Sequence, residues 1–322
     1  MENRNQQSAM FLLCMAVLMV IPVYLYGLRP LVILLVAVVS AMICDFIFNR
    51  LFHFSRRVRD LSSIEAAMAI ALMMPASVDY SVVVAAVVIG LVIAKYPFGG
   101  AGNQMFHPAA VGMCVAALSF GENVFRFPVP KTQLPLTAHI SDSAVLYTTS
   151  PASTLNIGGT PKIAWFDLLL GNFAGPMGAT CILVLLFMLI FLVLRRVISL
   201  YLTGGFLLTA AVYAFLFPRV STGRLDSVLF ELTSGILLFG VIFLASDRAT
   251  SPQTRLGQLL YGICLALAAM IFRTVGSLDV EFVFVLLFMN VLSVEFDRLG
   301  GVMMPYIRQG MGKLTGKAGA AK

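Results

Sequence analysis

Long apolar runs alternate with short polar segments along almost the whole chain. A transmembrane helix needs about 20 apolar residues to cross roughly 30 Å of hydrocarbon. Ten runs are candidates for such helices, at residues 10–28, 31–49, 64–78, 82–96, 107–121, 165–194, 201–218, 227–246, 257–274 and 278–296. The pattern predicts an all-α integral membrane protein with about ten transmembrane helices. We expect one membrane domain, with a first half over about 10–121, a loop over about 122–164, a second half over about 165–298 and a basic tail over 299–322.

Three of these runs are irregular. Run 64–78 is short, run 107–121 is short and begins next to a proline, and run 165–194 is interrupted by GNFAGPMG. Backbone that is not helical at membrane depth is tolerated only where it is buried in protein or lines a cavity. The sequence therefore predicts broken or re-entrant helices. The first run follows a single Arg and shows no small-residue cleavage site, so we expect it to be retained as a helix.

Acidic residues lie inside or at the ends of several runs, where charge is expensive enough to indicate function. They are Asp45, Glu65, Glu231, Glu281, Glu295 and Asp297. Glu65 and Glu231 stand in two loosely similar phrases, SIEAAMAIALMMP and LFELTSGILLFGV, in opposite halves of the chain. These phrases would run in opposite directions, as inverted repeats do in many transporters. Glu65 and Glu231 are candidates for an ion path, and an exposed carboxylate at a helix end is the alternative.

Composition and charge agree with a membrane protein. Of the residues 60 % are hydrophobic and 11 % charged, against roughly 25 % charged in a soluble domain. With the N-terminus inside, fifteen basic residues fall on the side of the termini, Lys95 among them, and seven on the other side, Arg29 and Arg273 among them. Cytoplasmic loops carry the excess of Lys and Arg, so we expect both termini in the cytoplasm and loop 122–164 outside. The basic residues are scattered without interleaved aromatic residues, so we expect no nucleic acid partner.

Cysteine usage predicts neither a disulfide nor a metal site within this chain. The five cysteines lie singly inside apolar runs, where a free cysteine behaves as a small hydrophobic residue. No pair has C-x-x-C spacing. A cysteine donated to a cluster shared between subunits stays open.

A glycine-rich stretch, AKYPFGGAGNQMFHPAAVG, covers residues 94–112. Gly99, Gly100 and Gly102 allow turns that other residues resist and close approach of a ligand. Pro108 is suited to open a helix, whose N-terminus would seat a carbonyl or an anion. The alternative is a loop that re-enters the membrane for packing, with His107 as a hydrogen-bonded structural residue.

A second polar stretch, FLASDRATSPQTRLGQ, covers residues 243–258. It ends an apolar run with Asp247 and then places Thr250 and Ser251 before the next one. Ser251 precedes Pro252 and is a candidate N-cap, which is the structural alternative for that residue. Both polar stretches lie on the predicted cytoplasmic side, which favours a shared pocket.

The outer loop contains YTTSPASTLN, residues 147–156. It concentrates five hydroxyl residues, Thr148, Thr149, Ser150, Ser153 and Thr154. A hydroxyl-rich turn is one explanation, and a site of covalent attachment is the other.

Four ordered motifs resemble one family, which contains the D subunit of the Rnf complex and the B subunit of the sodium-pumping NADH:quinone reductase. GGAGNQMFHPAAVG is similar to its GG-x-G-x-N-x-F-N-P-A-x-x-G stretch, and FLASDRATSPQTRLGQLLYG to its ATD-x-x-TSP-x-x-x-x-G segment. LLFMNVLSVEFDR is similar to its closing N-x-x-x-P-x-x-D segment, and LLLGNFAGPMGATCILVLL to the G-x-x-x-G-x-x-G-E-T opening of its middle helix. The resemblance covers residues 30 to 298, and the chain length favours the Rnf subunit.

The chain departs from the family pattern at four positions. His107 stands where the family has Asn, Ala179 where it has Glu, Arg248 where it often has Pro, and Val294 where it has Pro. Each departure concerns a particular hydrogen bond or backbone position, and the glycine turns are all present.

The resemblance implies ten helices in two inverted five-helix halves, like the fold of urea transporters. It also implies flavin mononucleotide (FMN) joined as a phosphodiester to a hydroxyl in an S/T-G-A-T-like motif of the outer loop, a bond made by a separate flavin transferase. Aligning SPASTL with that motif places Ser153 at the attachment position, with Pro151 in place of Gly. Thr154 and Thr149 are the alternatives. A second, non-covalent flavin, riboflavin or FMN, would suit Gly99, Gly100, Gly102 and Asn103 together with Asp247, Thr250 and Ser251.

The function that the resemblance implies is membrane electron transfer. The chain would be a subunit of an ion-translocating ferredoxin:NAD+ oxidoreductase (Rnf) complex of a bacterial or archaeal cytoplasmic membrane, coupling electron flow to Na+ or H+ transport. Its partners would be the other membrane, iron–sulfur and flavin subunits, and it would carry no catalytic residue of its own. The alternatives are the B-type subunit of the quinone reductase and a solute transporter or channel of the same fold without a redox role.

Overall fold

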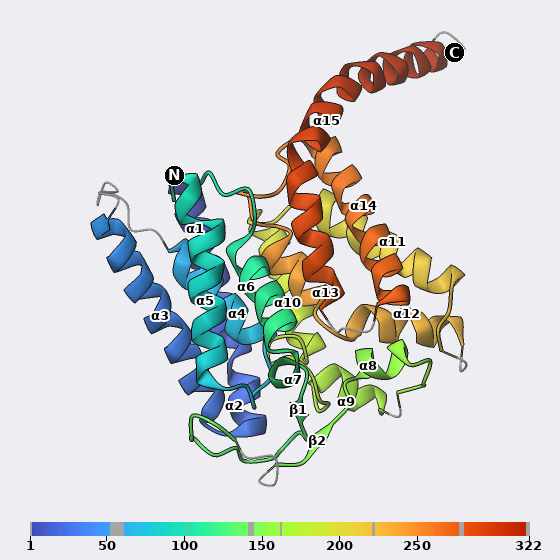
Figure 1. Ribbon diagram of the computed structural model, residues 1–322. Coiled ribbons are helices and arrows are strands. Elements are labelled where there is room, and N and C mark those ends of the chain that lie inside the picture. The colour runs from blue at the N-terminus through green and yellow to red at the C-terminus, as the bar shows by residue number, and fades with distance from the viewer. Residues whose placement is uncertain are drawn as a thin grey trace.

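The computed structural model describes residues 2–51, 61–100, 102–140, 145–161, 163–220, 223–276 and 280–319. Helices dominate these residues (Figure 1). The elements of the first half are α1 (Glu2–Leu18), α2 (Val20–Tyr26), α3 (Arg29–Leu51), α4 (Ser62–Met73), α5 (Tyr80–Ala94), the 3-10 turn η1 (Tyr96–Phe98), α6 (Pro108–Ser119) and α7 (Gly121–Val124). Short elements follow in the loop, namely β1 (Phe127–Pro128), β2 (Tyr147–Thr148), α8 (Pro151–Asn156) and α9 (Trp165–Leu170). β1 and β2 form one antiparallel pair.

The second half is also helical. Its elements are α10 (Ile182–Leu194), α11 (Leu200–Leu216), α12 (Arg224–Thr233), α13 (Leu237–Phe239), the π-helical turn η2 (Gly240–Leu244), α14 (Arg255–Val275) and α15 (Glu281–Gly319). Both chain ends lie at one end of the helix bundle, which we call the terminal face, and the segment from α7 to α9 lies at the opposite end, which we call the loop face (Figure 1). The last part of α15 extends away from the terminal face.

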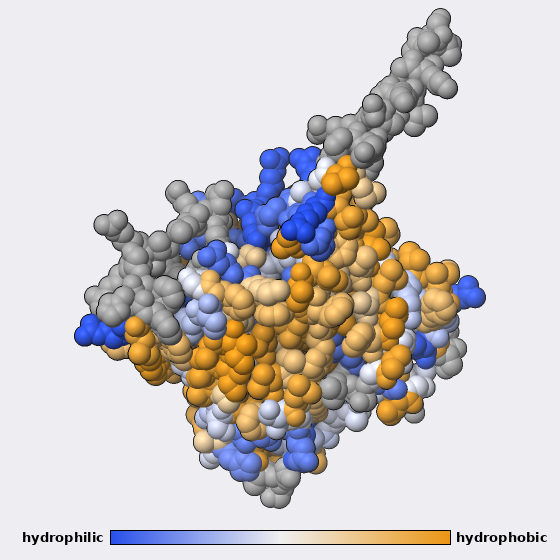
Figure 2. Space-filling view, turned by 45° about the horizontal axis from the view of Figure 1, so that its top comes forward, coloured by the Kyte–Doolittle hydropathy of each residue, from blue (hydrophilic) through white to orange (hydrophobic). Residues whose placement is uncertain are grey.

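On the face of the bundle shown in Figure 2, a belt of apolar side chains lies between two polar ends. Helix α10 exposes Leu183, Phe187, Ile190 and Leu194, which recur at helical spacing on one face. Exposed apolar patches of this extent indicate contact with another apolar phase, and only a structure that satisfies its backbone internally is compatible with lipid. The belt is therefore the lipid-facing surface of an all-α membrane protein, as the sequence predicts.

Among the residues that the structure describes, four helical segments are long and apolar enough to cross a membrane. They are Asn5–Tyr26, Arg29–Leu51, Tyr80–Phe98 and Arg255–Val275. The pair Arg224–Thr233 and Leu237–Leu244 forms a fifth span if it is counted as one, and four shorter apolar helices accompany them, Ser62–Met73, Pro108–Ser119, Ile182–Leu194 and Leu200–Leu216. Multi-pass insertion is thus evident, with several segments shorter than a full crossing.

The predicted interruption of run 165–194 is confirmed. Helix α9 lies beside α8 at the loop face (Figure 1), and the backbone is not helical from 171 to 181 before α10 begins. This segment crosses the end of α4, where Gly178 N donates to Leu72 O at 2.6 Å and Met177 N to Met74 O at 3.0 Å. A Cβ on Gly178 would lie 2.7 Å from Leu72 Cβ. The glycine is therefore needed for close approach, and the interruption is buried in protein as expected.

The predicted span 227–246 is wrong as a straight helix. Helices α12 and α13 meet at an angle of 60° across residues 234–236. Gly235 has φ 68°, a left-handed conformation that ends a helix readily. The second half therefore contains a broken helix, and in the first half the helical backbone breaks off at residues 74–79, between α4 and α5.

Helix α15 is longer than the predicted span 278–296. Residues 278 and 279 lie outside the described residues, and the helix runs from Glu281 through Gly319. The predicted basic tail is thus helical over most of its length.

Candidate functional site

The hydroxyl-rich segment forms the short helix α8 at the loop face. Ser150 is its N-cap and accepts from Ser153 N at 3.0 Å, with Pro151 in the first turn. Thr154 Oγ1 donates back to Ser150 O at 2.9 Å. The half-buried Ser153 hydroxyl makes no hydrogen bond to any residue that the structure describes, and Thr149 is exposed just before the helix. Ser153 and Thr154 are the two candidates for attachment within the helix. Of their hydroxyls, only that of Ser153 makes no hydrogen bond to the described backbone.

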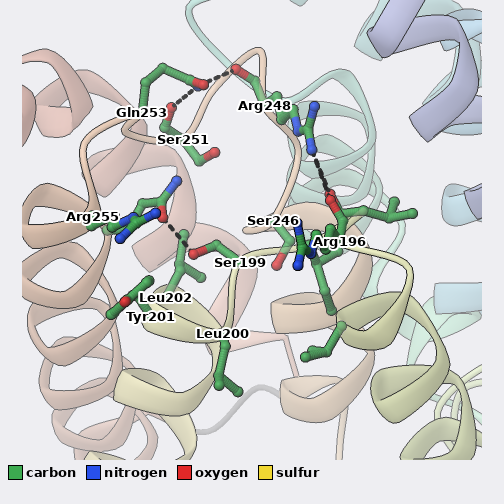
Figure 3. A pocket seen from close by; sticks show the side chains of 14 residues that line it. Arg196, Ser199, Leu200, Tyr201, Leu202, Ser246, Arg248, Ser251, Gln253 and Arg255 are labelled. Carbon is green, nitrogen blue, oxygen red and sulfur yellow. Dashed lines mark hydrogen bonds between the residues drawn. The ribbon is translucent and has the colours of Figure 1, made fainter.

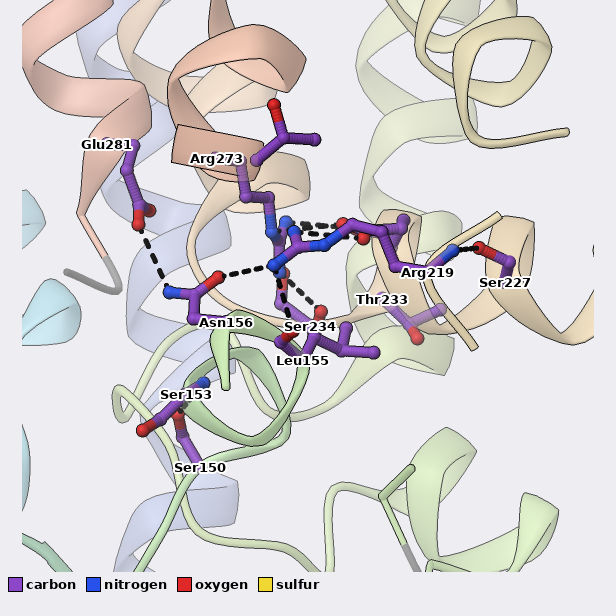
Figure 4. Close-up of polar contacts among 12 residues, drawn as sticks. Ser150, Ser153, Leu155, Asn156, Arg219, Ser227, Thr233, Ser234, Arg273 and Glu281 are labelled. Atoms are coloured by element: carbon purple, nitrogen blue, oxygen red, sulfur yellow. Dashed lines mark hydrogen bonds and ion pairs between the residues drawn. The ribbon is translucent and has the colours of Figure 1, made fainter. Parts of the chain in front are cut away.

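The apolar side of α8 is anchored to the bundle. Leu155 is buried and packs in a small cluster with residues from α9, the following segment and α12. Those residues are Leu168, Phe173, Val220 and Phe230. Packing on one side and a hydrogen-bonded cap at its start hold the helix in a fixed orientation, with Ser153 directed away from the arginines in Figure 4.

Arg219 connects α8 to the broken helix of the second half. Its Nη2 donates to Leu155 O and to Asn156 Oδ1, each at 2.9 Å, and its Nη1 lies 3.2 Å from Glu231 Oε1. Asn156 Nδ2 in turn donates to Glu281 Oε1 at 3.3 Å (Figure 4). The C-terminal end of α8 is thereby bonded to α12 and α15 together.

Glu231 is enclosed by two guanidinium groups. Besides Arg219, Arg273 of α14 places Nε 3.0 Å from Glu231 Oε2, in an ion pair whose angle does not suit a hydrogen bond. Arg273 also donates to Glu231 O at 3.1 Å and to Ser234 O at 3.2 Å, where α12 ends. Glu231 is 1 % exposed and Arg273 3 %. The alternative of an exposed carboxylate at a helix end is therefore wrong for Glu231.

Glu65 is also buried, at 6 % exposure, in the first turn of α4 near the terminal face. Two positions earlier, Ser63 Oγ donates to Asp45 Oδ1 at 2.7 Å and receives a short hydrogen bond from Lys95 Nζ. Lys95 is 2 % exposed and lies 3.5 Å from Asp45 Oδ1, and Tyr96 OH donates to the same oxygen at 2.9 Å. The alternative of an exposed carboxylate is therefore wrong for Glu65 as well. Asp45 of α3, Ser63 of α4 and the residues just after α5 form a charged cluster in which Lys95 is buried and Asp45 is half-buried.

The glycine stretch forms the turn that precedes α6. Gly99, Gly100 and Gly102 have φ of 89°, 89° and 107°, so all three adopt conformations that favour glycine. Asn103 is exposed beyond them. Pro108 opens α6 as predicted, and His107 caps it by accepting from Ala109 N at 3.2 Å. His107 thus has the structural role that the sequence offered as an alternative.

The two polar stretches meet through His107. Its Nε2 lies 3.9 Å from Asp247 Oδ2, and Asp247 Oδ1 accepts from Ala249 N at 3.1 Å. Thr250 is buried and Ser251 is half-buried in the same turn. A hollow beside this turn is lined by Ser251 but by none of residues 99–103. The stretches are therefore neighbours, joined by His107 and Asp247.

The cap of α14 differs from the prediction. Thr254, not Ser251, is the N-cap, and its side chain accepts from Gly257 N at 3.2 Å. Asp297 of α15 fixes this turn, since its carboxylate accepts from Gln253 N and Thr254 N at 2.8 Å each. Two of the motifs, 243–258 and 286–298, therefore meet in space.

Three buried polar atoms on or beside the two polar stretches have no hydrogen-bond partner among the described residues. They are Gln7 Oε1, Gln104 Nε2 and Thr250 Oγ1. Gln7 contacts the turn directly, because its Nε2 donates to Ser246 O at 3.0 Å. A buried polar group without a partner costs roughly 1–3 kcal/mol. Such atoms fit a region that binds a polar ligand.

Arg29, Arg219, Arg273 and Lys95 were not distinguishable as site residues in the sequence. Each lies at the end of an apolar run, where basic residues also occur as topological signals. Only the fold shows that Arg29, Arg273 and Lys95 are buried and bonded internally. Asp45, in contrast, was identifiable as an acidic residue inside a span.

The fold and site define a class: a multi-pass helical membrane protein with a bent helix pair in its second half and a hydroxyl-bearing helix fixed beside that bend. The model of the NQR2, RnfD, RnfE family matches residues 2–300, and the chain belongs to this family.

Similar proteins include the D subunit of the Na(+)-translocating ferredoxin:NAD(+) oxidoreductase complex of Acetobacterium woodii, 28 % identical over 85 % of this chain and 82 % of that protein. The D subunit of the ion-translocating oxidoreductase complex of Alcanivorax borkumensis is 25 % identical over 84 % of this chain and 83 % of its own length. The corresponding protein of Pectobacterium carotovorum is 25 % identical over 92 % of this chain and 94 % of its own length.

Proposed function

We propose that the chain is the D subunit of an Rnf-type complex, an ion-translocating ferredoxin:NAD+ oxidoreductase, and that it transfers electrons within the membrane without being catalytic alone. The observation that carries this proposal is the family match over residues 2–300, together with relatives named as D subunits that align over most of their length. The partners are the other membrane, iron–sulfur and flavin subunits of the complex.

The proposed arrangement is ten transmembrane segments in two inverted halves. The four long spans, the bent pair, the four short apolar helices and α15 supply ten segments. An interruption of the helical backbone in each half, after α4 and after α12, supports the inverted relation. By the excess of Lys and Arg on the terminal face, both termini lie in the cytoplasm and α8 lies outside, in a bacterial or archaeal cytoplasmic membrane.

Ser153 is the proposed attachment site of FMN through a phosphodiester made by a flavin transferase. Its hydroxyl is accessible and unbonded among the described residues, whereas that of Thr154 donates to Ser150 O at 2.9 Å. Thr149 is exposed and is the remaining rival. When bound, FMN supplies single-electron redox chemistry, and the protein supplies orientation and a fixed environment. Helix α8 contributes orientation, since Arg219 and Asn156 bond its C-terminal end to α12 and α15.

A second flavin is proposed beside the Asp247 turn. The two polar stretches meet where His107 Nε2 lies 3.9 Å from Asp247 Oδ2, and the positive-φ glycines at 99, 100 and 102 and exposed Asn103 precede that contact in the chain. Gln104 Nε2 and Thr250 Oγ1, one on each stretch, are buried without a hydrogen-bond partner among the described residues. Asp247 and Ser251 are on the same turn. The residues present therefore suit a non-covalent flavin, riboflavin or FMN.

Ion transport of Na+ or H+ is proposed to use the buried acids. Glu65 lies in the first turn of α4, beside the Asp45 and Lys95 cluster. Glu231 is held by Arg219 and Arg273, so it would act as a fixed negative charge rather than as a mobile carrier. Charged groups at such positions are expensive and favour a functional role.

Flavin retention after denaturation tests the redox proposal. The full chain is co-expressed with the transferase, acid-precipitated and run on a denaturing gel under flavin excitation. Retained fluorescence supports the proposal, and complete lack of it favours a solute transporter or channel of the same fold. Copurification with iron–sulfur subunits, followed by ferredoxin-dependent NAD+ reduction, separates the Rnf subunit from the quinone reductase subunit.

A further inference from the structure

An arginine-lined hollow opens at the terminal face between the end of α10, the start of α11 and the turn before α14. Its volume is about 550 Å³, and an adjoining hollow of about 620 Å³ against α1 shares Arg196, Val197 and Arg248 with it. Ligand sites commonly measure roughly 300–1,000 Å³. Each hollow is therefore large enough for a small polar group.

The lining is basic. Arg195, Arg196, Arg248 and Arg255 line the two hollows, and none of the lining residues is Asp or Glu. The acids of the neighbouring turn are already engaged, because Asp247 accepts from Ala249 N and Asp297 from Gln253 N. In Figure 3, Arg255 and Arg196 lie on opposite sides of the hollow with Ser199 between them. The hollow thus presents convergent positive charge that the described residues do not neutralise.

Arg196 occupies a backbone position that favours glycine. Helix α10 ends with Val197 N donating to Leu192 O at 3.0 Å and Arg196 N to Val193 O at 2.9 Å, which is the Schellman pattern. The residue after the cap is then left-handed, and Arg196 has φ 56°. A left-handed arginine is strained where glycine is not. The helix end would be formed equally well by glycine at this position. A role of the side chain in the hollow therefore explains the presence of arginine better than helix capping does.

Arg248 is held in place by the same turn. Its Nη2 donates to Arg196 O at 3.0 Å and to Val197 O at 3.5 Å. Arg255 lies over the ring of Tyr201, with 5.9 Å from Cζ to the ring centroid. Two of the four guanidinium groups are therefore oriented before any ligand binds, which lowers the cost of binding.

Apolar side chains of the lipid-facing belt adjoin the hollows. Leu194, Leu200 and Leu13 are 76 %, 64 % and 57 % exposed, and the last two line the hollows. A molecule that fits both features carries a phosphate and a hydrocarbon chain. Basic pockets between transmembrane helices at the cytoplasmic side suit anionic lipid headgroups.

We propose that this hollow is a phosphate-binding site, made by Arg196, Arg248 and Arg255, and that an anionic phospholipid of the surrounding leaflet supplies the phosphate. Arginine forks bind phosphate oxygens in pairs. The excess of Lys and Arg in cytoplasmic loops explains why arginines occur on this face. It does not explain why they line a hollow or why Arg196 has a left-handed backbone.

Lipid binding to the full chain in mixed detergent micelles tests this proposal. The probes are dioleoylphosphatidylglycerol, dioleoylphosphatidylcholine and inorganic phosphate, with native mass spectrometry as the readout. We expect phosphatidylglycerol to bind at least roughly tenfold more tightly than phosphatidylcholine, and Arg196→Gly and Arg255→Gln each to weaken it by roughly tenfold or more. Arg196→Gly keeps or raises the melting temperature, because glycine suits the position. This variant therefore separates binding from folding.

Arg50→Gln is the matched control, since Arg50 is exposed near the same face at the end of α3 and lines neither hollow. It leaves binding within about twofold, as expected for a surface charge. Equal weakening by Arg50→Gln, or equal binding of both lipids, overturns the site. If inorganic phosphate binds the wild type but not Arg196→Gly while phosphatidylglycerol does not bind, the phosphate chemistry stands and the lipid source is overturned.

Discussion

A buried arginine lies against each of the two breaks in the apolar helices. At the first break, Arg29 is 0 % exposed and donates to Ala76 O at 3.1 Å and Val78 O at 3.0 Å. It also donates to Pro135 O at 2.7 Å and Thr137 O at 2.5 Å in the loop. At the second break, Arg273 donates to Glu231 O and Ser234 O. Both arginines therefore bond carbonyls at points where the helical backbone breaks off: Arg29 in the turn after α4, and Arg273 at the end of α12.

The two breaks differ in what else the arginine contacts. The side-chain bonds of Arg29 end on four carbonyls. Arg273 shares the Glu231 carboxylate with Arg219, and Arg219 bonds the end of α8. The first break is thus tied to the segment 135–137, and the second to the helix that carries Ser153. Helix α8 is therefore coupled to movement at the second break, through the bonds of Arg219 to Leu155 O and Glu231.

We expect the greatest loss of stability from a substitution at the first break. Arg29→Met leaves four carbonyls without their donor, and each buried unsatisfied group costs roughly 1–3 kcal/mol. We expect the free energy of unfolding to fall by at least about 3 kcal/mol, or the chain not to fold. Fluorescence-detected size exclusion during heating measures this. The control Arg224→Gln, at an exposed arginine, changes stability by less than about 1 kcal/mol, and an equal loss in both contradicts the role of Arg29.

A substitution at the second break is expected to cause the second greatest loss of stability. Glu231→Gln removes the negative charge between two guanidinium groups, and breaking a buried ion pair costs about 3–5 kcal/mol. The hydrogen-bonding capacity of the amide offsets part of this, so we expect a loss of about 2–3 kcal/mol in the same heating assay. A glutamine variant as stable as the wild type would show that the ion pairs of Glu231 contribute no net stability.

Arg219→Gln tests the link between α8 and the second break. It breaks the bonds to Leu155 O and Asn156 Oδ1 but leaves Arg273 on Glu231. We expect a smaller stability loss, about 1–3 kcal/mol, together with a reduced fraction of protein that carries covalent flavin after co-expression with the transferase. In-gel flavin fluorescence per folded protein measures that fraction. An unchanged fraction would mean that α8 is positioned without Arg219.

The smallest effect is expected from Asn156→Ala, which removes one bond to Arg219 and one to Glu281. The loss is about 1 kcal/mol, and covalent flavin falls less than in Arg219→Gln. A larger flavin loss than in Arg219→Gln would place the main attachment of α8 on α15 instead of α12.

The apolar pattern was sufficient for the membrane class and for most helices, because lipid imposes long apolar runs on any spanning segment. GNFAGPMG and Pro108 marked real interruptions, since glycine and proline end helices by their own backbone preferences. The 60° bend before α13 was missed, because Ser234 and Gly235 are a weak signal inside an apolar run. The helical continuation after Asp297 was also missed, since charged residues resemble the end of a span.

The candidate site was only partly predictable. Ser153 followed from a motif, and its free hydroxyl required the structure, because Ser153 and Thr154 are chemically alike in sequence. The N-cap was assigned to Ser251 instead of Thr254, two hydroxyl residues three positions apart. The arginine links of α8 depend on packing between segments more than 60 positions apart, which no local pattern encodes.

Tandem mass spectrometry of the loop peptide, after co-expression of the full chain with the transferase, determines which hydroxyl carries FMN. We predict an FMN mass on Ser153, retained in Ser153→Thr and lost in Ser153→Ala, with Thr154→Ala unaffected. The mass on Thr154 or Thr149, or its persistence in Ser153→Ala, would contradict the assignment of Ser153 as the flavin anchor.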